Sequence, residues 1–469
     1  MINNYIESQI YKNFAHNPTQ QQKNLIGELA KYIANNTDQQ LFMINGYAGT
    51  GKTTIIASLV GALRELSIKC VLLAPTGRAA KVMSQYARER AYTIHKKIYR
   101  QKVIGGDSGI FTLDINRNNN TVYIVDEASM LANESRESAF GSGCLIDDLV
   151  EYINTGSDNR LIIIGDDAQL PPVGLEFSPA LNPLYMERYG EVFYNSLSQV
   201  VRQAAESGIL RNATNIRTDI DRENVVEPRF DLSVSDVLRI TGQELIEELE
   251  SCYSLFGKEE TIVITRSNKR ANQFNQGIRR SILGYEEEVC GGDMLMIVKN
   301  NYHWVDKEQN PNLEFIANGD VARVRRVQKI KEIYGFRFAY MTIEFGDYDD
   351  FTLDCWVLLD TLHSDAPSLT REQSSRLFYT IEQDYAEIGN KRNRYRKILE
   401  NDFFNALQVK FAYAVTCHKA QGGQWSSVFI DQLLYGDEQI TREFQRWLYT
   451  AVTRAQKKLY LVNWNERFF

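Results

Sequence analysis

The segment Gly46–Thr53 has the residue types and the spacing of a phosphate-binding loop. It matches the pattern GxxxxGK[ST], with an apolar run at 41–44 before it and a helical pattern after it. Glycines let successive backbone N–H groups face a polyphosphate, and the positive end of the following helix adds to that attraction. We expect Lys52 to reach the β- and γ-phosphates and the Thr53 hydroxyl to bind Mg²⁺. The segment therefore predicts a nucleoside triphosphate site, contacted by Gly46, Ala48, Gly49, Thr50, Gly51, Lys52, Thr53 and Thr54.

Acidic and amide side chains follow two later apolar runs that are typical of buried strands. Asp126 and Glu127 come directly after the run at 122–125, and Gln169 follows the run at 161–164. Because ligands gather at the carboxyl ends of parallel strands, we expect Asp126 to hold Mg²⁺. Glu127 is then placed to orient or deprotonate water, and Gln169 to sense the γ-phosphate. Further along the chain, Arg202 is a candidate arginine finger.

Gln22 lies upstream of the loop, next to a predicted helix over Lys23–Ile33 that has apolar residues at helical spacing. Pro18 and Thr19 ahead of that helix are a start signal. Two roles are open for Gln22: it reads the edge of an adenine, or it caps the helix.

The composition limits the class of protein. The chain has 469 residues, which predicts about two to four domains, and no run of 18 apolar residues that would span a membrane. Its six cysteines form no CxxC pair and its five histidines have no ligand spacing, so we expect reduced thiols, a cytoplasmic location and no zinc site. The net charge of −7 argues against a protein that coats nucleic acid, but a local basic channel is compatible with it.

Polar residues with phosphate-binding chemistry follow the apolar run at 70–74. Thr76 and Arg78 offer a hydroxyl and a guanidinium to a phosphate chain, and Thr93 and His95 repeat that chemistry. Basic residues also cluster at 78–102, 323–331 and 391–397, where the alternative interpretation is a solvated helix face.

Residues 99–121 interrupt the alternation of strands and helices. Gly105–Gly109 lies between strand-like runs at 102–104 and 110–113, which predicts a hairpin.

The ordered segments resemble superfamily 1 DNA helicases, in the branch that contains the RecD subunit and the phage Dda helicase. The matching segments are GYAGTGKTT (46–54), LAPTGRAAK (73–81), TIHK (93–96), VDEASM (125–130), GDDAQLPPVG (165–174), VVRQ (200–203), TIVITRSN (261–268), VTCHKAQG (415–422) and LYTAVTRA (448–455). Cys417 departs from the branch, where an aliphatic residue is usual.

The resemblance implies an α/β fold with two RecA-like domains, parallel sheets and ATP in the cleft between them. The first domain is expected at 1–195, and the second at 196–320 and 406–469. Arg202 and Arg454 are then expected to reach the γ-phosphate from the second domain. The implied catalytic set is Lys52, Asp126, Glu127, Gln169, Arg202 and Arg454, and the implied additional nucleotide contacts are Gln22, Gln421 and Gly422.

The resemblance also implies a path for single-stranded DNA across both domains. The expected contacts are Thr76, Arg78, Thr93, His95, Thr265, Asn268, Thr416, His418 and Lys419. The segment 321–405, strand-rich at first and helical later, falls where the branch inserts an SH3-like barrel. The hairpin at 99–121 falls where the branch has its strand-separating pin, and Phe111 is expected to stack on an exposed base.

These expectations favour an ATP-dependent DNA helicase that moves 5′ to 3′ as a monomer, with single-stranded and tailed duplex DNA as partners, ATP and Mg²⁺ as cofactors, and no membrane. Two other functions stay open: a RecD-like motor subunit of a recombination complex, and a phosphate-loop switch protein that binds nucleic acid without unwinding it. ATPase activity with and without single-stranded DNA separates the three.

Overall fold

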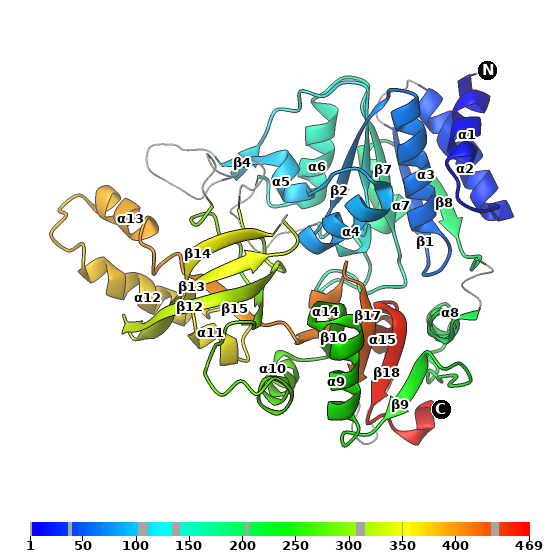
Figure 1. Ribbon diagram of the computed structural model, residues 1–469. Coiled ribbons are helices and arrows are strands. Elements are labelled where there is room, and N and C mark those ends of the chain that lie inside the picture. The colour runs from blue at the N-terminus through cyan, green and yellow to red at the C-terminus, as the bar shows by residue number, and fades with distance from the viewer. Residues whose placement is uncertain are drawn as a thin grey trace.

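The computed structural model describes residues 2–35, 40–101, 111–133, 141–201, 206–305, 315–348, 350–432 and 440–469. Within these ranges the chain forms two open sheets of parallel strands and one closed barrel (Figure 1). The predicted α/β class with two parallel-sheet domains and a small β module is confirmed. None of the described helices is both long and apolar enough to cross a membrane.

The first sheet comes from the N-terminal part of the chain and has the strand order β3-β2-β6-β7-β1-β8, with parallel neighbours. Its inner strands are apolar and buried along most of their length, which is typical of a sheet with helices on both faces. The strands are β1 (Gln40–Gly46), β2 (Lys69–Ala74), β3 (Ala91–Thr93), β6 (Thr121–Val125), β7 (Arg160–Gly165) and β8 (Glu191–Leu197). The helices are α1 (Ile2–Lys12), α2 (Gln20–Ala34), α3 (Lys52–Glu65), α4 (Gly77–Ala87), α5 (Ile94–Ile98), α6 (Leu145–Asn154) and α7 (Pro183–Met186).

This strand order places three predicted functional loops side by side. β6, β7 and β1 are consecutive neighbours and parallel, so the loops that follow them leave the sheet at the same edge. The phosphate-binding loop follows β1, the Asp126–Glu127 pair follows β6, and the Gln169 loop follows β7.

The second sheet has the order β16-β10-β17-β18-β9, again with parallel neighbours. The strands are β9 (Val237–Ile240), β10 (Thr261–Thr265), β16 (Ala414–Thr416), β17 (Trp425–Asp431) and β18 (Ala455–Val462). The helices are α8 (Gly208–Ile220), α9 (Leu245–Phe256), α10 (Asn268–Gly277), α14 (Cys417–Ala420) and α15 (Arg442–Val452).

A closed five-stranded barrel interrupts the second domain. Its strands are β11 (Met294–Ile297), β12 (Val321–Ile333), β13 (Phe336–Phe345), β14 (Phe351–Leu358) and β15 (Leu407–Phe411). The helices α11 (Asp360–His363), α12 (Arg371–Gln383) and α13 (Lys391–Leu399) lie between β14 and β15, and α12 and α13 project away from both sheets (Figure 1). β11 and β15 lie outside the predicted 321–405 insertion. The sequence did not indicate them, because both are short strands without an alternating pattern of their own.

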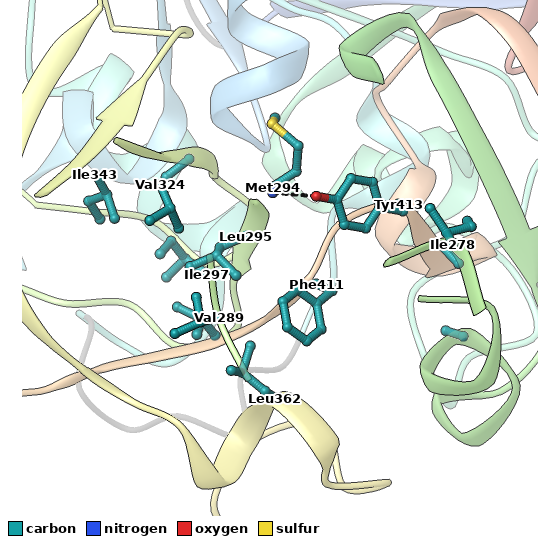
Figure 2. Packing of buried hydrophobic residues seen from close by; sticks show 14 of the residues in the cluster. Ile278, Val289, Met294, Leu295, Ile297, Val324, Ile343, Leu362, Phe411 and Tyr413 are labelled. Carbon is teal, nitrogen blue, oxygen red and sulfur yellow. Dashed lines mark hydrogen bonds between the residues drawn. The ribbon is translucent and has the colours of Figure 1, made fainter. Parts of the chain in front are cut away.

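The barrel shares its core with the second sheet. One apolar cluster contains Leu295 and Ile343 from the barrel together with Val263 and Phe429 from the sheet. Figure 2 shows this junction, where the Met294 N–H donates to the Tyr413 hydroxyl at 3.2 Å. The shared core packs the barrel against the second domain.

The predicted hairpin is described only at its base. β4 (Tyr99–Gln101) and β5 (Phe111–Leu113) pair antiparallel, with Tyr99 opposite Leu113. The predicted glycine turn at 105–109 and the strand at 102–104 lie outside the described residues.

Candidate functional site

The phosphate-binding loop has a backbone that only glycine accommodates easily. Gly49 and Gly51 have φ of 75° and 86°, in the left-handed region. A Cβ added at Gly51 would lie 2.5 Å from Nε2 of Gln22, and one added at Gly46 would lie 2.8 Å from Cγ of Lys52. Gly51 is also the N-cap of α3 and provides no side-chain cap. The N–H groups at the start of α3 are thus available to an anion.

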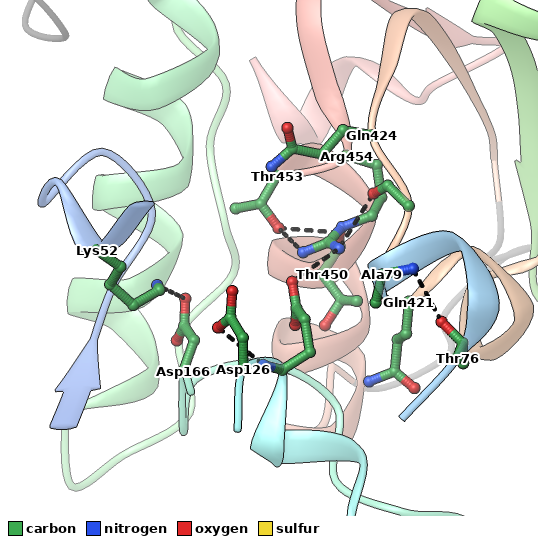
Figure 3. A network of polar contacts seen from close by, with 12 residues as sticks. Lys52, Thr76, Ala79, Asp126, Asp166, Gln421, Gln424, Thr450, Thr453 and Arg454 are labelled. Carbon is green, nitrogen blue, oxygen red and sulfur yellow. Dashed lines mark hydrogen bonds and ion pairs between the residues drawn. The ribbon is translucent and has the colours of Figure 1, made fainter. Parts of the chain in front are cut away.

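Lys52 connects the loop to the end of β7. Its Nζ donates to the Gly46 carbonyl and lies 3.7 Å from Oδ2 of Asp166 (Figure 3). Asp166 is buried, and its burial raises the pKa of the carboxyl group, while Lys52 and the hydrogen bond from Tyr449 act in the opposite direction. A buried carboxylate with these partners orients the lysine within the loop.

Asp126 and Glu127 occupy the end of β6. Oδ2 of Asp126 accepts a hydrogen bond from the Tyr86 hydroxyl at 2.6 Å, and Oδ1 accepts from the Glu127 N–H at 2.8 Å. Glu127 has φ of 54°, a conformation that costs free energy for a residue with a Cβ and that is enriched at functional sites. Burial raises the pKa of Glu127, opposed by Arg454, and a raised pKa suits a carboxylate that takes a proton from water.

Arg454 reaches this carboxylate from the second domain. Its Nη1 lies 3.9 Å from Oε1 of Glu127, and its side chain is 3% exposed. The guanidinium donates to the Thr450 carbonyl at 3.0 Å, the Gly423 carbonyl at 3.2 Å and the Thr453 hydroxyl at 3.2 Å. These bonds hold the arginine in a fixed direction across the cleft (Figure 3).

The other predicted arginine, Arg202, lies outside the described residues. Its neighbour Val201 donates its N–H to the Gly49 carbonyl at 2.9 Å, so the described chain reaches the phosphate-binding loop just before that position.

The two predicted glutamines lie against this site. Gln22 forms a capping box with Thr19, and its Nε2 donates to the Thr50 carbonyl at 2.9 Å. The capping interpretation is therefore confirmed, and contact with adenine stays a prediction. Oε1 of Gln169 is buried and has no hydrogen-bond partner within the described part of the chain. An unpaired buried acceptor next to a phosphate-binding loop fits a ligand or water that donates to it.

The donor set fits Mg²⁺ bound together with a nucleotide. Thr53 is exposed on the first turn of α3 and would provide a hydroxyl, and Asp126, directly after β6, would provide a carboxylate. Among the described residues no group of three or more His, Cys, Asp or Glu side chains is placed to hold a metal alone. Mg²⁺ typically takes one or two protein oxygens and completes its shell with phosphates and water, so this arrangement suits it.

A groove runs from the first domain to the second beside the nucleotide cleft. Its first part is lined by Thr76, Thr93 and His95 from the first domain and by His418 and Lys419 from the second. Its second part continues from His418 and Lys419 to Thr416 and Asn268, with Arg266, Lys269 and Lys410 also in its lining. Seven of the nine residues expected to contact a DNA backbone therefore lie along one surface that crosses both domains.

The remaining predicted DNA contacts lie elsewhere. Arg78 points into the interface between the domains, where its guanidinium lies 4.1 Å from the Trp425 ring and donates to the Gln424 carbonyl at 3.0 Å. Thr265 is fully buried and donates to the carbonyls of Ser267 and Val415, so it holds the end of β10.

The prediction that Phe111 stacks on an exposed base is wrong. Phe111 is 4% exposed, and its ring centroid lies 4.4 Å from that of Tyr302. The aromatic side chain belongs to the core under the hairpin, because β5 turns it towards the protein.

Gln421 and Gly422 also contact the first domain. Nε2 of Gln421 donates to the Leu170 carbonyl at 2.7 Å, and a Cβ at Gly422 would meet Oγ1 of Thr76 at 3.2 Å. Both residues lie where the groove and the cleft meet, and direct contact with a nucleotide stays a prediction.

The chain is similar to several known proteins. Residues 19–227 match the family described as an AAA domain, and residues 411–462 match the UvrD-like helicase C-terminal domain. The chain is 25% identical over 472 residues to the ATP-dependent DNA helicase dda of enterobacteria phage T4, covering 95% of this chain and 99% of that protein. It is 27% identical over 197 residues to the ATP-dependent RecD2 DNA helicase of Deinococcus radiodurans, covering 42% of this chain and 24% of that protein.

The family matches and these relatives support a superfamily 1 helicase of the RecD and Dda branch.

A longer protein and a solved structure are also similar to this chain. This helicase is 25% identical over 486 residues to the uncharacterized protein MJ1519 of Methanocaldococcus jannaschii, but it spans only 37% of that protein. The Pif1 helicase from Bacteroides, solved with ADP-AlF3 and single-stranded DNA, has a TM-score of 0.47 and 16% identity over 96% of this chain and 93% of that one.

The charge in the groove of this helicase comes from lysine and arginine. Burial lowers the pKa of His95 to about 4, and it also lowers the pKa of His418. Both rings are therefore neutral at pH 7, and they can contact a nucleic acid through hydrogen bonds or stacking. Lys419, Arg266 and Lys269 carry the positive charge along the same surface.

Three residues of the nucleotide site were missed by reasoning from the sequence: Tyr86, Asp166 and Tyr449. Asp166 had a usable signal, because it directly follows the same apolar run that precedes Gln169. Tyr449 lies in the matching segment LYTAVTRA (448–455) but was given no role there, and Tyr86 had no signal, because each meets its carboxylate only through the tertiary fold.

Proposed function

We propose that this protein is an ATP-dependent DNA helicase that moves 5′ to 3′ on single-stranded DNA and unwinds tailed duplexes by strand exclusion. The observation that carries the proposal is the position of Arg454. This buried residue of the second domain lies 3.9 Å from Glu127 of the first, so the hydrolysis site is shared between the domains. The groove of predicted DNA contacts is shared between the same two domains.

A shared site makes hydrolysis depend on the relative position of the domains. Lys52 and the N–H groups at the start of α3 hold the triphosphate, and Glu127 orients the attacking water. Arg454 stabilises the charge that develops on the transferred phosphoryl group only when the second domain is close. Thr53 and Asp126 would hold Mg²⁺, which would supply positive charge against the phosphates.

Contacts between cleft and groove support a coupling of the two. Gln421 lines the groove and donates to the carbonyl of Leu170, next to Gln169. Thr76 lines the groove and lies against Gly422. A change in the separation of the domains therefore alters both the nucleotide site and the spacing of the strand contacts.

We propose that the first ATPase domain extends through β8 to Leu197, slightly past the expected boundary at 195, and that the second domain follows it, interrupted by the barrel module between Met294 and Phe411. The polarity follows from the resemblance to the RecD and Dda branch. The names of the phage T4 and Deinococcus relatives, both called ATP-dependent DNA helicases, support the activity. A monomer in the cytoplasm is the simplest form of the proposal.

Strand displacement on duplexes with a single 5′ or 3′ tail tests this function. We expect ATP-dependent displacement of the 5′-tailed substrate and little displacement of the 3′-tailed one. Lys52→Ala, which removes the phosphate-binding lysine, is the matched control and should displace neither. Displacement of the 3′-tailed substrate alone would contradict the proposed 5′-to-3′ movement. ATPase activity without any displacement would favour the motor-subunit or switch alternatives.

A further inference from the structure

One face of α15 crosses the cleft and contacts the first domain. Arg446, Tyr449 and Thr450 are spaced so that they share this face, whereas the opposite face packs into the core of the second domain. The Arg446 guanidinium donates to the Asp167 carbonyl. The Thr450 hydroxyl accepts the Leu170 N–H at 2.8 Å. The loop after β7 is thus held by a helix of the other domain.

Tyr449 makes the central contact of this face. Its hydroxyl donates to Oδ2 of Asp166 at 2.7 Å and accepts the N–H of Ala48, in the phosphate-binding loop, at 2.9 Å. The same carboxylate oxygen lies 3.7 Å from Nζ of Lys52. Tyr449 and Asp166 are each 1% exposed, so no bulk water replaces these bonds.

The hydroxyl has one proton to donate, and the two bonds determine its direction. Removing it leaves a buried carboxylate oxygen and a backbone N–H of the phosphate-binding loop without this partner. The expected consequence is a displaced Asp166, and with it a displaced Lys52, while the other contacts of the loop persist.

We propose that Tyr449 is a positioning residue that links closure of the two domains to the geometry of the phosphate-binding loop. With the second domain in place, its hydroxyl holds Asp166 beside Lys52 and fixes the loop at Ala48. With the domains apart, the loop loses both bonds. The proposal rests on the proposed function and assigns one residue to the coupling between DNA binding and hydrolysis.

A continuous set of contacts connects the groove to Tyr449. Gln421 lines the groove and bonds to the carbonyl of Leu170, and the N–H of Leu170 bonds to Thr450. Thr450 is the next residue after Tyr449 on α15. Single-stranded DNA bound in the groove against Gln421 therefore favours the position of α15 in which Tyr449 reaches the phosphate-binding loop.

The test is ATPase kinetics of Tyr449→Phe, with Tyr413→Phe as the matched control. Tyr413 also donates to a buried aspartate, Asp293 at 3.0 Å, and also accepts a backbone N–H, from Met294 at 3.2 Å, but it lies in the core of the barrel junction (Figure 2). We expect Tyr449→Phe to lower kcat on single-stranded DNA about tenfold and to change KM for ATP less than twofold. Tyr413→Phe should lower thermal stability without changing kcat per folded molecule.

Asp166→Asn provides a second, independent variant. If Tyr449 acts through Asp166, the double variant should lose no more kcat than the worse of the two single variants. Wild-type kcat in Tyr449→Phe, or a loss equal to the loss of folded protein, would overturn the positioning role. Fully multiplicative losses in the double variant would also overturn it. A wild-type ATPase that does not respond to DNA would instead contradict the proposed function.

Discussion

At the scale of residues, the expected hydrolysis site pairs carboxylates with cations, and one of these pairs joins the two domains. Glu127 has a left-handed backbone, a pKa raised by burial, and Arg454 of the second domain at 3.9 Å. Lys52 faces a second buried carboxylate, Asp166. These pairs give each residue a direction before a nucleotide binds, which is the preorganisation that phosphoryl transfer requires.

Glu127→Gln should retain nucleotide binding and lose turnover. If Glu127 takes the proton from the attacking water, the amide should lower kcat by a factor on the order of 10² to 10⁴. Binding of a fluorescent ATP analogue measured alongside steady-state ATPase activity checks both parts. Turnover close to that of the wild type would remove Glu127 from the mechanism.

At the scale of elements, the barrel and the first domain meet at a buried acid. Asp320, just before β12, accepts hydrogen bonds from the Tyr348 hydroxyl and the Ala317 N–H, and a Cβ added at Gly77 at the start of α4 would lie 2.6 Å from it. Burial raises the pKa of Asp320 to about 7; Asp347 acts in the same direction, and Lys96 in the opposite one. The junction is therefore sensitive to pH.

Asp320→Asn should flatten the pH dependence of stability. The folded chain favours the neutral carboxyl, whereas the unfolded chain ionises it near pH 3.8. The contribution of Asp320 to stability therefore falls as pH rises from about 4 to about 7 and stays constant above that. Between pH 5 and pH 7.5 the wild type should lose about 2.5 kcal/mol more than Asp320→Asn. Denaturant titrations of the wild type and of Asp320→Asn at the two pH values check this.

The hairpin at 99–121 is the second element with a separable role. Its base is ordered by Phe111 against Tyr302, and its tip is the expected wedge at a duplex junction. Deleting Gly105–Gly109 should abolish unwinding of a 5′-tailed duplex and spare ATPase activity on single strands. Opening a duplex costs about 1.4 kcal/mol per base-pair step, so a rigid block against re-annealing has a measurable effect. If the deletion variant unwinds at the wild-type rate, the hairpin is only a surface connection.

These elements differ in how far the sequence alone could predict them. The segments around β1, β6 and β7 were predictable because short apolar runs followed by polar loops have one common solution in a parallel sheet. β11 and β15 were not, since they complete the barrel only by pairing with each other across more than a hundred residues. Arg78 and Phe111 have side chains suited to DNA, but the fold places the first against Trp425 and the second in a core. The sequence contains the chemistry of such residues, and tertiary contacts decide which surface they face.

At the scale of the molecule, the two parallel sheets share one nucleotide site and one groove. α15 and the segment at Gln421 belong to the second domain but hold the loop after β7 of the first. The barrel is fixed to the second domain through a common core and touches the first at Asp320. Closure of the cleft and movement along a strand are therefore expected to be one event.

The central claim is that DNA in the groove completes the ATPase site by bringing Arg454 towards Glu127. The direct measurement is kcat for ATP with and without single-stranded DNA, for the wild type and for Arg454→Ala. We expect low activity without DNA, a strong increase with DNA in the wild type, and loss of that increase in Arg454→Ala with DNA binding retained. Equal activity with and without DNA in the wild type, or full stimulation in Arg454→Ala, would contradict the account.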